Sequence, residues 1–209
     1  MRRSGRKTTK GRGVRVLTRA QRTTVLHRAA WMVAEINDAQ PKCVEGVALL
    51  DRVADLVHIK AEPVPVAVAV QGPAGSCLLG EAVDGVIPVS AGGRVIRSPT
   101  TALWSGAGHL VLFSSEEKTL FDPTLDQVNP ATGFARGALI MPVTADELFT
   151  EDLTLTVDEG VKVLYRAVRG DTSWRTAYNT TYARSGLSAR TVARRALELE
   201  GFDEDLVPA

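Results

Sequence analysis

Residues 108–127 read GHLVLFSSEEKTLFDPTLDQ, and this stretch decides the fold class. Two short runs, 108–113 and 119–122, are rich in apolar and aromatic residues that favour strands, and a polar segment separates them. Runs of this kind joined by a short turn predict an antiparallel hairpin. His109 opens the first run and Asp122 closes the second, so we expect the two side chains to lie side by side at one end of the hairpin.

Other predicted strands lie on both sides of this hairpin. The run PVPVAVAV at 63–70 has the β-branched composition of a strand, and its prolines place it at a sheet edge or at the start of a strand. Residues 138–143 predict another strand. A second hairpin is predicted over 153–157 and 161–168, which are joined by a three-residue loop that ends in Gly160.

The N-terminal part of the chain has helical periodicity. Apolar residues at helical spacing predict a helix over 18–38 with Thr18 as its N-cap, and a second helix over 42–57 after Pro41. By contrast, residues 71–107 are rich in Gly, Ala, Ser and Pro. This composition predicts a long excursion with little regular structure.

The C-terminal part is also predicted to be helical. One helix is expected over 172–184 and another over 188–200, with Ser188 as N-cap and Gly201 just past its end. Helices first, then antiparallel strands, then a helix indicate an α+β fold with a sheet of about five strands. No G-x-G-x-x-G motif or P-loop follows a strand, which disfavours nucleotide-binding enzymes of those types.

The charge of the chain is unevenly distributed. Residues 1–22 hold nine of the 25 Lys and Arg residues and no acid, whereas the remainder carries sixteen basic and 24 acidic residues. A basic arm of this kind can contact nucleic acid or another polyanion. Because no aromatic residues interleave with the charges, we favour a disordered, solubilising arm over 1–17.

Composition also bears on compartment and cofactors. The apolar runs fall short of the roughly 20 residues that span a bilayer, and no apolar segment follows the basic N-terminus as in a secretory signal. We therefore expect a cytoplasmic protein with no membrane partner. The two cysteines, Cys43 and Cys77, lack C-x-x-C spacing and are too few for a structural zinc site. We expect neither a metal nor a cofactor.

Cys43 stands at the predicted start of an apolar helix, directly after Pro41 and Lys42. The unpaired N–H groups and partial positive charge of a helix N-terminus favour thiolate over thiol, and Lys42 adds a nearby cation. The same N–H groups can stabilise an oxyanion. Cys77 lies among Gly, Ala and Ser residues without a helix signal after it, so Cys43 is the stronger candidate nucleophile.

A thiolate nucleophile needs a base, and the base needs an orienting group. The predicted hairpin supplies both, because Asp122 can accept a hydrogen bond from one ring nitrogen of His109. The other ring nitrogen then faces the thiol of Cys43. Asp126 is an alternative acid, but its offset from Asp122 is expected to point it away from the strand pair.

Three other titratable residues are expected to lie outside the chemistry. His27 is predicted mid-helix and structural. His58 lies at the far end of the helix that Cys43 begins, so it is a poor base. Glu45 would hinder a thiolate and is interpreted as a solvated acid of the first helical turn.

Three segments together resemble the papain-like fold in its transglutaminase-like form: CVEGVALLDRVADL (43–56), AEPVPVAVAV (61–70) and the hairpin at 108–127. The resemblance extends over residues 40–145. This superfamily includes transglutaminases, arylamine N-acetyltransferases and bacterial leader peptidases. Its nucleophilic Cys begins a helix packed on the sheet, and its His and Asp lie on adjacent strands. The ending DPTLDQ resembles the D-x-T-x-x-Q ending of the Asp strand in some bacterial members.

The resemblance implies a role for each matching residue. Cys43 would be the nucleophile, His109 the base and Asp122 the orienting acid. Gln127 would be a polar contact beside the triad or an oxyanion contact. Residues 18–170 would form the catalytic domain, and 171–209 a C-terminal helical appendage.

Three hypotheses follow for the function. The first is a cysteine-dependent hydrolase or acyltransferase that acts on an amide or ester of a peptide, protein or small acyl substrate. The second is a binding protein on the same fold with an inactive triad. The third is a nucleic-acid-associated protein that uses residues 1–22.

Overall fold

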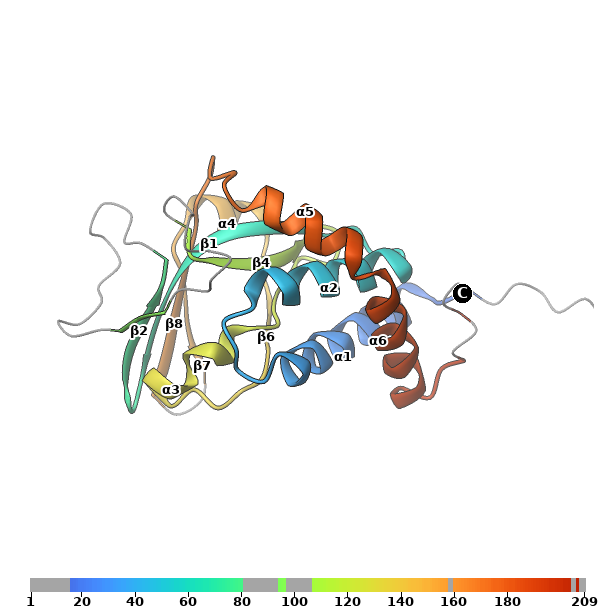
Figure 1. The fold of residues 1–209 in the computed structure, drawn as a ribbon, viewed down its shortest axis with the longest axis horizontal. Coiled ribbons are helices and arrows are strands. Elements are labelled where there is room, and N and C mark those ends of the chain that lie inside the picture. Colours follow the sequence, from blue (N-terminus) through green and yellow to red (C-terminus); the bar gives the residue numbers. More distant parts are fainter. Residues whose placement is uncertain (1–15, 81–93, 97–106, 158–159, 204–205, 207–209) are drawn as a thin grey trace, which may run out of the picture.

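The architecture is α+β, with the longer helices gathered on one side of a curled sheet (Figure 1). Among the described residues, seven strands pair antiparallel in a half-barrel, and a short strand, β3 (Arg94–Ile96), runs parallel to β2 (Gly75–Leu79). The α+β order of elements is confirmed, but the sheet is larger than the five strands predicted. The computed structural model describes residues 16–80, 94–96, 107–157, 160–203 and 206.

The sheet has the strand order β3-β2-β1-β4-β5-β6, with β8 also paired to β1 and β7 paired to β8. Both predicted hairpins are present as antiparallel pairs, β4 with β5 and β7 with β8. The remaining strands are β1 (Glu62–Gly72), β4 (His109–Ser114), β5 (Thr119–Asp122), β6 (Leu139–Pro142), β7 (Leu153–Val157) and β8 (Val161–Ala167).

The central strand of the sheet is β1. Residues Val66–Gln71 pair with β8, and residues Glu62–Val66 pair with β4. The carbonyl of Pro65 accepts a hydrogen bond of 2.9 Å from the N–H of Val168, just beyond the β8 ladder. The side of Pro65 that lacks an N–H donor therefore faces the end of β8, just beyond the last paired residues of the β1–β8 ladder. Of the two predicted positions for this run, the start of a strand is right and the sheet edge is wrong.

The prediction of little regular structure over 71–107 is wrong for part of that segment. Strand β2 lies within it and pairs with the second half of β1, and β3 follows. Cys77 therefore lies in a strand, opposite Val70, and not in a loop. This strand was not predicted because its residues are small or lack branching at Cβ. Its stability comes from pairing with β1. Residues 81–93 and 97–106 lie outside the described part of the chain.

The two N-terminal helices agree with their predictions. Helix α1 (Arg19–Asn37) has Thr18 as its N-cap, and Thr18 and Gln21 form a reciprocal capping box. Helix α2 (Cys43–Leu56) begins within one residue of its predicted start. Three short elements were not predicted: the 3-10 helix η2 (Leu125–Val128), α3 (Asn129–Thr132) and α4 (Ala145–Thr150).

Helices α5 (Arg175–Arg184) and α6 (Gly186–Leu199) form the C-terminal part. The predicted N-cap at Ser188 is wrong, because α6 begins at Gly186, whereas Gly201 has the left-handed backbone (φ 72°) expected just past the helix. Two tyrosines of α5 donate hydrogen bonds to acids of α2, Tyr178 to Asp51 and Tyr182 to Asp55. These pairs join α5 to the helix that Cys43 begins.

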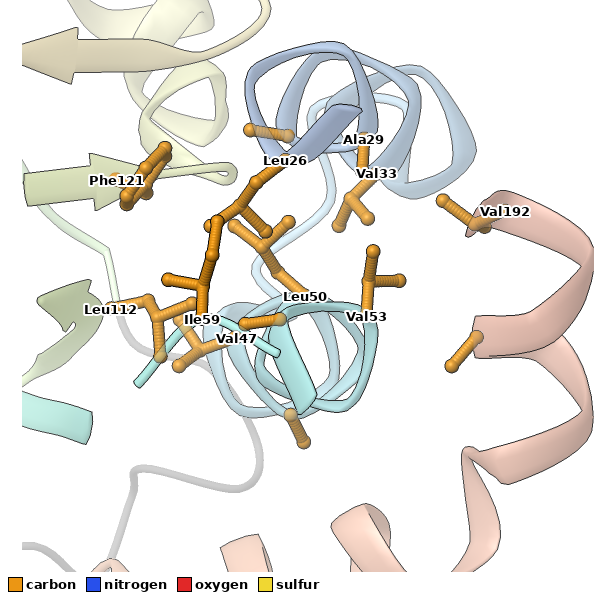
Figure 2. Close-up of a cluster of buried hydrophobic side chains, with 14 of the residues drawn as sticks. Leu26, Ala29, Val33, Val47, Leu50, Val53, Ile59, Leu112, Phe121 and Val192 are labelled. Atoms are coloured by element: carbon orange, nitrogen blue, oxygen red, sulfur yellow. The ribbon is translucent and has the colours of Figure 1, made fainter. Parts of the chain in front are cut away.

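Side-chain alternation along the sheet creates two cores. In β4, Leu110 and Leu112 pack among the helices, whereas Val111 and Phe113 pack on the other face with β1 and β8. Figure 2 shows the helical core, where side chains of α1, α2 and α6 meet side chains from the sheet. The labelled residues are Leu26, Ala29, Val33, Val47, Leu50, Val53, Ile59, Leu112, Phe121 and Val192.

Most of the basic arm, residues 1–15, lies outside the described residues. Leu17 packs in the helical core. Arg19 forms an ion pair of 2.9 Å with Glu117, and Arg22 donates to the carbonyl of His58 at 2.9 Å. These last two basic residues therefore bind the folded body. None of the described helices is long and apolar enough to cross a membrane.

Candidate active site

Cys43 is the first residue of α2, and its side chain is fully buried. Lys42 occupies the N-cap position, but its side chain makes no capping hydrogen bond to the first turn. The backbone N–H groups of that turn therefore point toward the end of the helix where the sulfur lies. The prediction of a thiol at a helix N-terminus is confirmed.

Close packing fixes the position of this helix tip. The turn before α2 has left-handed backbone at Asp38 (φ 49°) and Ala39 (φ 54°). One turn into the helix, a Cβ atom on Gly46 would lie 2.5 Å from Cγ2 of Thr124 and 2.7 Å from Nδ2 of Asn37. The glycine thus lets α2 approach the segment that follows β5.

His109 and Asp122 meet at the open end of the β4–β5 hairpin, as predicted. Nε2 of His109 lies 2.8 Å from Oδ2 of Asp122, and both side chains are fully buried. The ladder between the two strands ends at the pair Leu112 and Phe121. The imidazole and the carboxylate therefore lie just beyond the last paired residues of the hairpin.

Two further groups hold the carboxylate of Asp122. The hydroxyl of Tyr165 donates to Oδ2 at 2.8 Å, and the N–H of Thr124 donates to Oδ1 at 3.1 Å. Burial, followed by the charge of Asp122, raises the pKa of Tyr165 well above its ordinary value, so the hydroxyl remains a neutral donor. Sequence analysis missed both residues. The available signal was that Tyr165 is in phase with Val161 and Val163 on the buried face of β8.

Gln127, in η2, contacts the ring nitrogen of His109 that does not face Asp122. Its Nε2 lies 3.1 Å from Nδ1 of His109 and donates to the carbonyl of Thr124 at 2.8 Å. A carbonyl partner requires an N–H group at this position, so the amide also donates to Nδ1. The predicted polar contact beside the triad is thus a hydrogen bond to the imidazole itself.

The side chain of Cys43 lies close enough to the ring of His109 to act on its pKa, which it raises. Desolvation by burial is the largest single influence on the pKa of His109 and lowers it. The charge of Asp122 and its hydrogen bond to the ring, with a smaller contribution from Cys43, outweigh burial and raise the pKa of the ring. Since Nε2 faces Asp122, a proton from the sulfur would go to Nδ1, the nitrogen that Gln127 also contacts. The structure therefore brings together the three residues that sequence analysis placed in separate segments.

The site lies where the two cores meet. Cys43 packs in the helical core, and Tyr165 packs in the core on the opposite face of the sheet. His109 and Asp122 connect them through the hydrogen bonds described above. Water is excluded from both sides, so charges in the site interact strongly.

Asp126 is not the acid paired with His109, in line with its predicted offset, and Glu45 is more buried than predicted. Oδ1 of Asp126 is buried without a hydrogen-bond partner among the described residues. Burial, followed by the negative charge of Asp122, raises its pKa to about 7. Glu45 is a half-exposed acid of the first turn of α2, as predicted in part, but its Oε2 is buried and lacks a hydrogen-bond partner in the described part of the chain.

The remaining candidates lie outside the site. His58 follows the end of α2 opposite Cys43. His27, on α1, contacts the ring of Phe121 edge-on at 5.5 Å, and burial lowers its pKa. Cys77 is buried in β2. Within the described residues, no group of three or more His, Cys, Asp and Glu side chains is placed to hold a metal ion.

Comparison of the chain with protein-family models, with curated proteins and with solved structures found no match. The function of the site is therefore argued from the geometry and chemistry of its own residues.

Proposed function

We propose that the protein is a cysteine-dependent hydrolase or acyltransferase that acts on an amide or ester. The observation that carries the proposal is the buried pair of His109 and Asp122, 2.8 Å apart, with the side chain of Cys43 close enough to the ring to act on its pKa. A nucleophile, a base and an orienting acid in this order are the parts that acyl transfer through a thioester requires.

Each group has a chemical role in the first half-reaction. The thiol proton of Cys43 moves to Nδ1 of His109, and the sulfur attacks the carbonyl carbon of the substrate. The oxyanion formed is stabilised by backbone N–H groups in the first turn of α2. When the bond to the leaving amine or alcohol breaks, His109 returns the proton to that group and a thioester remains on Cys43.

The second half-reaction determines the class of enzyme. Water or an acceptor amine attacks the thioester, and His109 takes a proton from the attacking group. The carbon–sulfur bond then breaks and the thiol regains its proton from the imidazolium. Water gives a peptidase or amidase, and an amine gives a transglutaminase-like acyltransferase. Throughout, Asp122 fixes the ring and stabilises its positive charge.

The complete burial of Cys43 favours a second candidate, a binding protein on the same fold with an inactive triad. In that protein the three residues would form a purely structural polar network. The two candidates differ in one measurable property, the reactivity of the sulfur and its dependence on the imidazole.

The test is alkylation by iodoacetamide at pH 7, followed by mass mapping of Cys43 and Cys77. Activation by the imidazole predicts that Cys43 is labelled faster than Cys77. It also predicts that His109→Gln slows labelling at Cys43 by at least about tenfold, since an activating base contributes on that scale.

His58→Asn is the matched control, because His58 is exposed and has left-handed backbone (φ 57°), which asparagine tolerates. This variant should label at the wild-type rate. Equal, slow labelling of both cysteines in the wild-type protein, unaffected by His109→Gln, would support the inactive candidate.

A further inference from the structure

Three polar side-chain atoms near the proposed site are buried and have no hydrogen-bond partner among the residues that the structure describes. They are Nδ2 of Asn37, Oγ1 of Thr124 and Oδ1 of Asp126. The three residues are 5%, 0% and 9% exposed. Buried polar groups are normally hydrogen-bonded, because an unpaired one destabilises the fold. Three such atoms in one region therefore indicate a binding role.

These atoms converge from two segments of the chain. A Cβ atom on Gly46 would meet both Thr124 and Asn37 within 2.7 Å, so these two side chains lie on the same side of the α2 tip. The backbone N–H of Ala39 acts on the carboxyl group of Asp126 and lowers its pKa, so the two groups lie close together. The end of α1 and the turn before α2 thus face the segment 124–127.

The same region adjoins the reacting groups. Ala39 and Gly46 flank Cys43 in sequence, four residues before and three residues after it. The charge of Asp122 acts on Asp126, and the neighbouring Gln127 binds the His109 ring. A ligand group held at Asp126 would therefore lie beside the carbonyl that the sulfur attacks.

The donor or acceptor character of the three unpaired atoms indicates which ligand group can bind them. Oδ1 of Asp126 accepts hydrogen bonds, and Oγ1 of Thr124 can do so. Asp122 adds negative charge nearby. A cationic N–H donor satisfies these groups. Nδ2 of Asn37 is a donor, and it suits a carbonyl oxygen on the same ligand.

We propose that Asp126, with Thr124, forms a subsite for a cationic group, an ammonium or guanidinium, on the substrate whose carbonyl Cys43 attacks. This inference rests on the proposed function and adds a substrate class, a peptide or amide with a basic side chain. Burial, followed by the charge of Asp122, raises the pKa of Asp126 to about 7. A bound cation would restore the ionised carboxylate that burial disfavours.

The test uses two thiol reagents of matched size, 2-aminoethyl methanethiosulfonate and propyl methanethiosulfonate. One carries an ammonium where the other carries a methyl group. The rate of modification of Cys43 by each is measured in the full chain by mass mapping and divided by its rate with free glutathione. The subsite predicts a preference of about tenfold for the cationic reagent, because the buried carboxylate attracts it through a medium of low dielectric constant.

Asp126→Asn should abolish most of this preference, and Thr124→Val, which removes Oγ1 at constant shape, should reduce it. Asp146→Asn is the matched control, since it removes the same charge from an exposed residue of α4 and should leave the preference unchanged. A preference that is equal in wild type and Asp126→Asn overturns the subsite.

The proposed subsite and the proposed function can be disproved separately. If propyl labelling of Cys43 depends on His109 but the cation preference does not depend on Asp126, only the subsite is wrong. If His109→Gln leaves propyl labelling unchanged, the proposed function itself is wrong. Absence of labelling by either reagent counts against both.

Discussion

Gln127 donates a hydrogen bond to Nδ1 of His109 at 3.1 Å, the same nitrogen that must receive the proton of Cys43. A ring nitrogen that accepts a hydrogen bond carries no proton, so this contact stabilises the neutral imidazole. Asp122 acts in the opposite direction, because its charge favours the imidazolium. In the resting site, Gln127 therefore favours the neutral thiol and imidazole, whereas Asp122 favours the thiolate–imidazolium pair.

Replacing Gln127 with Leu should shift this balance toward the ion pair. The variant removes the donor to Nδ1, so we expect alkylation of Cys43 at pH 7 to rise about threefold and its pH profile to move to lower pH. The measurement is the iodoacetamide rate between pH 5 and pH 9. Gln71→Leu, on an exposed part of β1, serves as the control. A rate that drops as far as in His109→Gln would show that Gln127 mainly orients the ring.

Tyr165→Phe tests whether the carboxylate must be held from the opposite core. The variant keeps the ring but removes one donor to Oδ2 of Asp122. We expect a loss of about 1–3 kcal/mol in the free energy of unfolding, measured in urea, because a buried charged acceptor loses a partner. Alkylation of Cys43 should slow as well. Tyr182→Phe, which removes a more exposed hydrogen bond to Asp55, should cost less and leave the alkylation rate unchanged.

Gly46→Ala tests the close approach of α2 to the segment after β5. The added methyl group would lie 2.5 Å from Thr124, so the helix tip must shift away from it. We expect a destabilisation of about 1–3 kcal/mol, as in other overpacked interiors, together with slower alkylation of Cys43. Gly186→Ala is the matched control, since a Cβ atom there meets only Arg52 at 4.0 Å among the described residues. Gly186→Ala should leave the free energy of unfolding equal to that of the wild type or slightly higher.

The stability of Asp126→Asn should depend on pH with a defined sign. The pKa of Asp126 is raised to about 7 by burial and then by the charge of Asp122, whereas an aspartate in an unfolded chain titrates near pH 4. Between about pH 4 and about pH 7, the carboxyl group of Asp126 therefore carries a proton in the folded protein but not in the unfolded chain. The contribution of the carboxyl to stability is therefore complete below about pH 4 and is lost as pH rises through about 7.

Asparagine removes this titration. Asp126→Asn should thus be more stable than wild type at pH 8, on the order of 2 kcal/mol, with little difference at pH 4. Urea unfolding at the two pH values is the measurement, with Asp146→Asn as the variant that should show no such change. A gain of the same size at both pH values would mean that the carboxyl does not titrate in this range.

The predictable parts of the structure are those that depend on neighbours in the sequence. The capping box at Thr18, the apolar face of α2 and the alternation in the 108–122 hairpin are local patterns, and each gave the right element. The prediction failed where an element depends on a distant partner. Strand β2 is stable because it pairs with β1, and no local pattern within its own residues indicates that pairing.

The same distinction applies to the candidate site. Cys43 at a helix start, and His109 and Asp122 at the open end of a hairpin, follow from local patterns and topology. The roles of Tyr165 and Thr124 do not, because their hydrogen bonds to Asp122 depend on how β8 and the segment after β5 fold back on the site. The contact of Gln127 with His109 required the turn of η2.

The sequence by itself determined the α+β order of the longer helices and the two hairpins, the hairpin that pairs an imidazole with a carboxylate, and the thiol at the head of an apolar helix. Only the tertiary structure decided that the thiol lies close to the imidazole, that a tyrosine from the opposite core binds the carboxylate, and that Oδ1 of Asp126 is buried without a hydrogen-bond partner among the described residues. The reason is physical. Periodicity and capping act within a few residues of the chain, whereas burial and hydrogen bonding in a site depend on side chains that only long-range packing brings together.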